Sequence, residues 1–111
     1  KQFLKVTVLF QESNKPEVYT ARDGDENSGS RISDGILKRY SKDGKLKAEC
    51  SYREGKLHGL STTYFETGAI RSRENYVEGE LSGLSRNYHP DGRVKSDCYY
   101  DHGKLISEKK Y

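Results

Sequence analysis

A unit of 24 residues occurs three times in succession over residues 35–106, without a single insertion. Glycine, tyrosine and aliphatic residues mark it at fixed offsets: Gly35, Gly59 and Gly83; Tyr40, Tyr64 and Tyr88; Gly44, Gly68 and Gly92; Leu46, Ile70 and Val94; Tyr52, Tyr76 and Tyr100; Gly55, Gly79 and Gly103; Leu57, Leu81 and Leu105. A period of this length is typical of repeat proteins, in which each unit packs mainly on its neighbours. The chain is therefore predicted to be an array of one small structural unit.

Each unit is predicted to contain two strands and two turns. The first turn lies in the triplets Lys-Asp-Gly, Glu-Thr-Gly and Pro-Asp-Gly, which end at Gly44, Gly68 and Gly92. These glycines supply the positive φ that a tight hairpin turn requires. The second turn ends at Gly55, Gly79 and Gly103. The runs between turns have strand length and are too short for helices, so we predict an all-β fold, an antiparallel meander of about seven strands.

Alternation of side chains along a strand predicts one aliphatic and aromatic face and one charged face. The first strands are expected to place on the apolar face Ile36, Lys38 and Tyr40; Leu60, Thr62 and Tyr64; Leu84, Arg86 and Tyr88. The second strands are expected to add Leu46, Ala48, Cys50 and Tyr52; Ile70, Ser72, Glu74 and Tyr76; Val94, Ser96, Cys98 and Tyr100. The charged face would hold Lys47, Glu49, Arg71, Arg73, Lys95 and Asp97. An apolar face this large must curl, be covered, or meet a partner.

The boundary between a non-repeat segment and the array is placed after residue 34. Residues 1–34 are predicted to hold two strands, around 4–10 and 17–22, which pair and extend or cap the sheet, followed by a polar loop. The array covers 35–111, as units 35–58, 59–82 and 83–106 and a terminal strand 107–111. In the loop, Asp23, Asp25, Asn27 and Asp34 fall on calcium-loop positions. Ser28 replaces the glycine of that motif and no helices flank it, so we expect no metal there.

The composition argues against several classes of protein. Only 32% of the residues are hydrophobic, yet nine tyrosines make disorder a poor description. Twenty basic and 17 acidic residues interleave, which disfavours nucleic-acid binding because such proteins carry a basic stripe or block. No apolar run approaches the length of a membrane span. The chain starts at Lys1 and has no methionine, so we expect a natural start upstream, compatible with a removed leader and with either the bacterial cytoplasm or the periplasm.

The residue types that usually carry catalysis or hold metals are not arranged for either task. Cys50 and Cys98 share one repeat position four strand spacings apart, roughly 19 Å, which excludes a disulfide between them. We expect both to be small buried side chains. The histidines at 58, 89 and 102 lie at three different repeat positions and do not converge as metal ligands would. We expect no enzyme activity and no cofactor.

The repeat resembles a known family. Residues 59–82, Gly-Leu-Ser-Thr-Thr-Tyr-Phe-Glu-Thr-Gly-Ala-Ile-Arg-Ser-Arg-Glu-Asn-Tyr-Val-Glu-Gly-Glu-Leu-Ser, resemble the MORN-repeat variant of bacterial proteins, and residues 35–58 and 83–106 match at the same places. In the last copy, Ser107 stands where the next glycine would fall. The resemblance implies an open, twisted antiparallel sheet. It also implies similarity to YwqK-type antitoxins, which pair with a secreted or polymorphic toxin.

These observations lead to two classes of function. The first is an immunity or antitoxin protein that binds a cognate toxin through a tyrosine ladder and an arginine, with the candidate residues Tyr40, Tyr52, Tyr64, Tyr76, Tyr88, Tyr100 and Arg86. The alternative for the tyrosines is that they pack on each other as the sheet's own core. The second class is a scaffold module that self-associates through sheet edges or the apolar face. Binding of anionic lipid through Lys38, Lys47, Arg71 and Lys95 is a weaker alternative.

Overall fold

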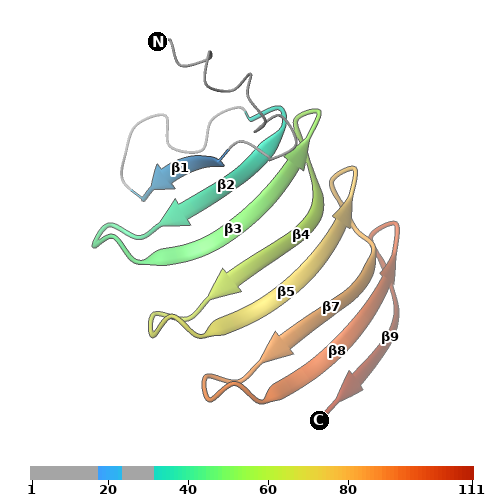
Figure 1. The fold of residues 1–111 in the computed structure, drawn as a ribbon. Coiled ribbons are helices and arrows are strands. Elements are labelled where there is room, and N and C mark those ends of the chain that lie inside the picture. The colour runs from blue at the N-terminus through green and yellow to red at the C-terminus, as the bar shows by residue number, and fades with distance from the viewer. Residues whose placement is uncertain (1–17, 24–31) are drawn as a thin grey trace, which may run out of the picture.

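The described part of the chain forms one open β-sheet (Figure 1). The computed structural model describes residues 18–23 and 32–111. Its strands are β1 (Val18–Arg22), β2 (Gly35–Tyr40), β3 (Leu46–Arg53), β4 (Lys56–Tyr64), β5 (Ile70–Val77), β6 (Glu80–Leu81), β7 (Gly83–Tyr88), β8 (Val94–Asp101) and β9 (Lys104–Lys110). Neighbours in the chain are neighbours in the sheet, and β6 pairs only with β5. No helix that could cross a membrane occurs among the described residues.

The predicted meander is confirmed for β2 to β9, in which every strand pair is antiparallel. The N-terminal segment adds the strand predicted near 17–22, as β1. It pairs with β2 in parallel, with Val18 beside Ile36. The predicted strand at 4–10 lies outside the described residues, as do Asp25 and Asn27 of the calcium-like loop.

Two kinds of turn alternate along the array, as the glycine spacing predicts. In the β2–β3 turn, the amide of Gly44 donates to the carbonyl of Ser41 at 2.9 Å, and the equivalent glycines of β4–β5 and β7–β8 do the same. Gly68, in the middle copy, has φ +97. The other turns contain two residues, and in the first of them Glu54 and Gly55 have φ of 51 and 81. Two successive positive φ values define the tight hairpin turn that matches the twist of the strands.

Hydrogen bonds between successive units join the repeats at the end of the sheet where the two-residue turns lie. The amide of Gly79 donates to the carbonyl of Leu57 at 2.7 Å, and the amide of Gly103 donates to Leu81 at 2.7 Å. The first unit makes the same bond to the segment before it, from Gly55 to Ser33. The glycine of each two-residue turn therefore also fixes the spacing of the units.

A bulge in each unit decides which side chains share a face. Residues paired across antiparallel strands lie on the same face. In the first unit Arg39 lies opposite Ala48, whereas Tyr40 lies opposite Leu46, which leaves Lys47 as an extra residue. The same shift follows Thr63 on β4 and Asn87 on β7. The extra residue breaks the simple alternation along the second strand of each unit.

The bulges give the sheet two faces that differ from the predicted ones. The inner face carries Leu37, Arg39, Ala48, Cys50, Tyr52, Ser61, Thr63, Ser72, Glu74, Tyr76, Ser85, Asn87, Ser96, Cys98 and Tyr100. The outer face carries Ile36, Lys38, Tyr40, Leu46, Glu49, Leu60, Thr62, Tyr64, Ile70, Arg73, Leu84, Arg86, Tyr88, Val94, Asp97 and Tyr99.

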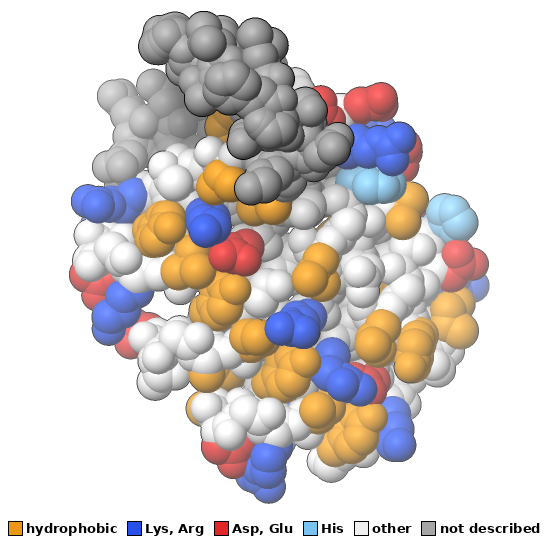
Figure 2. All heavy atoms as spheres, viewed as in Figure 1, with side chains coloured by type: hydrophobic (Ala, Val, Ile, Leu, Met, Phe, Trp, Pro, Cys, Tyr) orange, Lys and Arg blue, Asp and Glu red, His pale blue; other side chains and the backbone are white. Residues whose placement is uncertain are grey.

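The prediction of one apolar face and one charged face is therefore wrong. Simple alternation placed Ile36 of the first strand and Cys50 of the second strand on one face. In the structure Ile36 pairs with Ser51, so it lies on the face opposite Cys50. Both faces mix polar and apolar residues. Figure 2 shows Lys and Arg side chains interspersed with hydrophobic ones on the side in view.

The best-buried apolar residues lie at the N-terminal end of the array. Leu37 is 1% exposed and packs in a cluster with Ala21 of β1 and Ile32, against Tyr52. The described part of the non-repeat segment thus adds apolar cover to the first unit, as expected of an atypical terminal unit. Over β5 to β9 the described sheet is a single layer.

Candidate partner-binding surface

Small side chains form the floor of the inner face. Across β4 to β8 the described residues Ser61, Ser72, Ser85, Ser96 and Cys98 are each less than 9% exposed. Hydrogen bonds connect part of this floor, from Thr63 to Ser72 at 2.6 Å and from Asn87 to Ser96 at 3.2 Å. Side chains so short are buried at the surface of a single sheet only if larger neighbours rise beside them. We refer to this row of short side chains, between the longer ones described next, as the groove of the inner face.

One wall of this groove is aromatic and aliphatic. Tyr76 lies opposite Gly59 on one side and Leu81 on the other, and Tyr100 lies between Gly83 and Leu105 in the same way. Burial, followed by the nearby Glu74 carboxylate, raises the pKa of the Tyr76 hydroxyl. These rings are half-buried, so each can pack on the sheet and still present an edge to a ligand.

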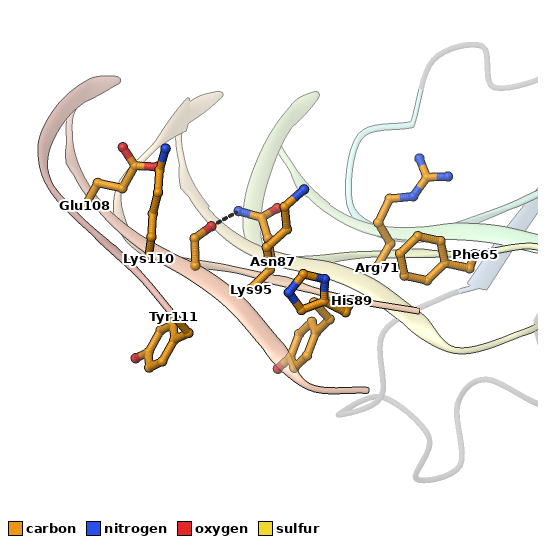
Figure 3. Close-up of a pocket in the computed structure, with 10 residues that line it drawn as sticks. Phe65, Arg71, Asn87, His89, Lys95, Glu108, Lys110 and Tyr111 are labelled. Atoms are coloured by element: carbon orange, nitrogen blue, oxygen red, sulfur yellow. Dashed lines mark hydrogen bonds between the residues drawn. The ribbon is translucent and has the colours of Figure 1, made fainter. Parts of the chain in front are cut away.

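The other wall is basic. Each bulge places a cation at the same repeat position, namely Lys47, Arg71 and Lys95. Figure 3 shows Arg71, Lys95 and Lys110 rising on the concave side of the curved sheet with Asn87 and Glu108, whereas Tyr111 lies on the convex side. A cavity of about 680 Å³ has these three cations in its lining. Tyr88 and Tyr111 of the outer side also line it, so the cavity is bordered by residues of both faces at this end of the strands.

Aromatic side chains and one carboxylate complete the lining of this cavity. The guanidinium of Arg71 stacks on the ring of Phe65 at 5.1 Å from its centre. The lining also includes Tyr88, His89, Tyr111 and a single acid, Glu108. Stacking holds the Arg71 head without neutralising it. The cavity therefore combines positive charge with flat apolar surface.

The comparisons with known proteins establish the family. The model described as "MORN repeat variant" matches residues 33–54, 57–78 and 81–102, which together make up more than half of the chain. The chain belongs to the MORN repeat variant family. No curated protein and no solved structure matched it. The three matches repeat every 24 residues, which confirms the predicted period.

The MORN array separates the tyrosines that were predicted to form one ladder. Tyr52, Tyr76 and Tyr100 lie on the inner face, and the other three lie on the outer face opposite Leu46, Ile70 and Val94. Burial, followed by the charge of Glu49 on the same face, raises the pKa of Tyr64. Only half of the predicted ladder can meet any one ligand.

Arg86, the predicted arginine anchor, lies on the outer face and is already paired. Its guanidinium donates two hydrogen bonds to the Asp97 carboxylate, at 2.7 and 2.9 Å. The Tyr111 hydroxyl donates to the same carboxylate at 2.7 Å. The hydrogen bonds from Arg86, and to a smaller extent that from Tyr111, lower the pKa of Asp97 to about 2. This arrangement ties β7, β8 and the C-terminus together, so the structure favours a stabilising role for Arg86.

Alternation predicted the cations of the inner wall to be exposed and on the face opposite Leu46, Ile70 and Val94, as they are in the structure. It also grouped them with Glu49, Arg73 and Asp97, which the bulges put on the other face, and it did not predict that Arg71 and Lys95 line a cavity with Lys110. A sequence feature could have revealed them, since the residue at this repeat position is basic in all three units. Positions that keep their charge within an array, while their neighbours vary, point to a shared environment.

The prediction that both cysteines are buried is confirmed for Cys98 but not for Cys50, which is half-buried, and the histidines are spread out. Cys50 and Cys98 are free, on strands β3 and β8, with Cys98 buried. Burial raises the pKa of the Cys98 thiol, which makes it a poor nucleophile. Of the histidines, His58 accepts a hydrogen bond from the amide of Glu78, and His102 contacts Asp101. In the described residues no group of three metal-ligand side chains occurs.

Proposed function

We propose that this MORN-repeat chain acts by binding rather than by catalysis, and that it neutralises a cognate bacterial toxin or secreted effector by direct contact. The observation that carries the proposal is the inner-face groove. It has an aromatic wall, a basic wall with a cavity between Arg71 and Lys110, and no second layer over it among the described residues. Concave sites with convergent polar groups are where ligands bind.

The chemistry of the groove suits a protein partner. Tyrosine and arginine are enriched where interfaces gain most of their affinity, because both offer large, stiff contact surfaces. The groove presents both, in Tyr76, Tyr100 and Arg71. The toxin-neutralising role itself is supported by the resemblance of the repeat to YwqK-type antitoxins. A protein of that class needs a wide recognition surface and no reactive centre.

Co-expression tests this function. Each gene that neighbours the coding sequence would be expressed from an inducible promoter, with and without this chain. We expect one neighbour to arrest growth alone, to be tolerated with the chain, and to co-elute with it in size-exclusion chromatography. A Tyr76→Ala/Tyr100→Ala variant should rescue less well than Tyr40→Ala/Tyr64→Ala, which changes the outer face away from the cavity. Absence of rescue and of a complex with every neighbour would remove the toxin reading.

A scaffold role is the second candidate, and the edge strand β9 favours it. All seven residues of β9 are exposed, and Leu105 and Ile106 are 48% and 59% exposed. An unpaired edge can add a strand from another chain. Lys104, Lys109 and Lys110 oppose such pairing, because edge lysines are a common protection against it. Sedimentation over a wide range of protein concentration decides: a constant monomer mass excludes self-association as the function.

A further inference from the structure

We infer that the cavity lined by Arg71, Lys95 and Lys110, in the C-terminal half of the array, takes an acidic segment of the partner protein. The inference rests on the proposed binding function and names the chemistry of its partner. Arg71, Lys95 and Lys110 line the cavity against one carboxylate, Glu108. None of the three cations forms an ion pair with any described residue.

The repeat itself provides the comparison that makes the unpaired charge significant. Lys47 occupies the same repeat position as Arg71 and Lys95, and its ammonium pairs with Asp23 at 2.5 Å. Asp23 lies just beyond β1, so the non-repeat segment neutralises the first member of the row. The second and third members have no such partner among the described residues. Free positive charge is thus concentrated between β5 and β9.

One hydroxyl in the floor of the inner face, near the cavity, has no hydrogen-bond partner among the described residues. The Ser85 hydroxyl is 4% exposed at the residue level and, among the described residues, is the one buried side-chain oxygen or nitrogen without a hydrogen-bond partner. Buried polar atoms are almost always hydrogen-bonded. Ser85 lies on β7, two residues before Asn87 of the cavity lining. The hydroxyl is enclosed and Ser85 is outside the cavity lining, so it makes the floor polar without contacting the ligand.

The shape of the site selects a peptide over other anions. Arg71 and Lys110 lie on strands three spacings apart, roughly 14 Å, so a row of carboxylates along a peptide matches the row of cations better than a single phosphate group does. The cations lie on the concave side of the sheet (Figure 3), which a flat lipid bilayer cannot enter. A narrow chain with several carboxylates can lie along the groove and contact each cation in turn.

The test uses a fluorescein-labelled peptide of about eight residues rich in glutamate, long enough to span the cavity at about 3.3 Å per residue. Fluorescence anisotropy would measure its binding to the full chain, with a peptide carrying glutamine in place of glutamate as the neutral probe. We expect the acidic peptide alone to bind. The double variant Arg71→Glu/Lys95→Glu should weaken that binding by about tenfold or more, since two charge pairs are replaced by repulsion.

Matched controls separate this site from the general charge of the protein. Lys56→Glu/Lys104→Glu makes the same change in net charge at the far end of the strands, beside the two-residue turns, and should alter binding by less than about twofold. The neutral pair Arg71→Gln/Lys95→Gln, checked for folding by thermal melting, should also weaken binding. Equal loss in both charge-reversal variants, or no binding of the acidic peptide at all, would overturn the inference.

Vesicles of phosphatidylserine and phosphatidylcholine test the membrane alternative with the same variants. Vesicle binding that depends on Arg71 and Lys95, with peptide binding unaffected, would also overturn the inference. The result is separate from that of the co-expression test. Peptide binding without toxin rescue would contradict the proposed function but support the acidic-segment site. Rescue that persists in the Arg71→Glu/Lys95→Glu variant would support the proposed function but contradict the site.

Discussion

Glycine at the longer turns, which join β2 to β3, β4 to β5 and β7 to β8, is fixed by backbone geometry and not by crowding. Gly68 has φ +97, and a Cβ added there would meet no atom within 4 Å. The requirement is therefore conformational, because an L side chain at this φ strains its own backbone. The same is true of Gly44 and Gly92.

Replacing Gly68 with valine should destabilise the array by more than about 1 kcal/mol, because a β-branched residue is a poor occupant of the left-handed region. Urea unfolding monitored by circular dichroism measures the change. Glu66→Val is the matched control, since Glu66 is exposed in the same turn and has no positive φ. Equal stability of the Gly68→Val variant and the parent protein would refute the hairpin register.

The serines of the inner floor differ in what their hydroxyls contact. Ser72 is hydrogen-bonded to Thr63, whereas Ser85 has no partner. Ser72→Ala should cost about 1 kcal/mol, because the Thr63 hydroxyl is left without its partner, whereas Ser85→Ala should be neutral or slightly stabilising. Thermal unfolding of the two variants under one buffer checks the difference. A cost for Ser85→Ala as large as that for Ser72→Ala would show that the hydroxyl is bonded in solution.

At the scale of elements, pairing across the outer face stabilises the C-terminal strands. Asp97 of β8 is 4% exposed and accepts hydrogen bonds from Arg86 of β7 and from Tyr111. An ion pair that keeps its carboxylate nearly buried is costly to break from one side, because the remaining cation loses its partner. The open edge strand β9 leads directly into Tyr111, so this contact also fixes its end.

This pairing predicts a pH dependence of stability. The pKa of Asp97 is lowered from 3.8 to about 2, chiefly by Arg86. A depressed folded pKa means that the stabilisation is present above the unfolded pKa near 4 and is lost as the pH falls toward 2. Asp97→Asn should therefore lower the unfolding midpoint at neutral pH, and the gap to the parent protein should close between about pH 4 and pH 2. A gap that stays constant over this range would exclude the pairing as its cause.

At the scale of the whole molecule, the repeat made the architecture predictable. Glycines at positive φ and tyrosines at fixed offsets required hairpins of one length, and the sheet of β2 to β9 has that order. The separation of Cys50 from Cys98 followed directly from counting strands. The strand near 17–22 was also predictable, although its parallel pairing with β2 was not, because alternation gives no partner or direction.

The site was harder to predict than the fold because it depends on the bulges. One extra residue per unit, such as Lys47 opposite the step from Arg39 to Tyr40, moves side chains between faces without leaving a gap in the repeat. Alternation therefore grouped tyrosines that lie on opposite faces, and it grouped Arg71 and Lys95 with Asp97 of the outer face. Arg86 was predicted to contact a partner protein because its ion pair with Asp97 could not be foreseen. That pair depends on the register of β7 against β8, which alternation does not give.

The central claim is that this open array binds a protein through its inner face. Hydrogen–deuterium exchange of the chain, alone and with the partner found by co-expression, tests that claim most directly. We expect the backbone amides of β5, β7, β8 and β9 to exchange more slowly in the complex. The Arg71→Glu/Lys95→Glu variant should show no such slowing. Protection confined to β1 and β2, or none in a complex that demonstrably forms, would contradict it.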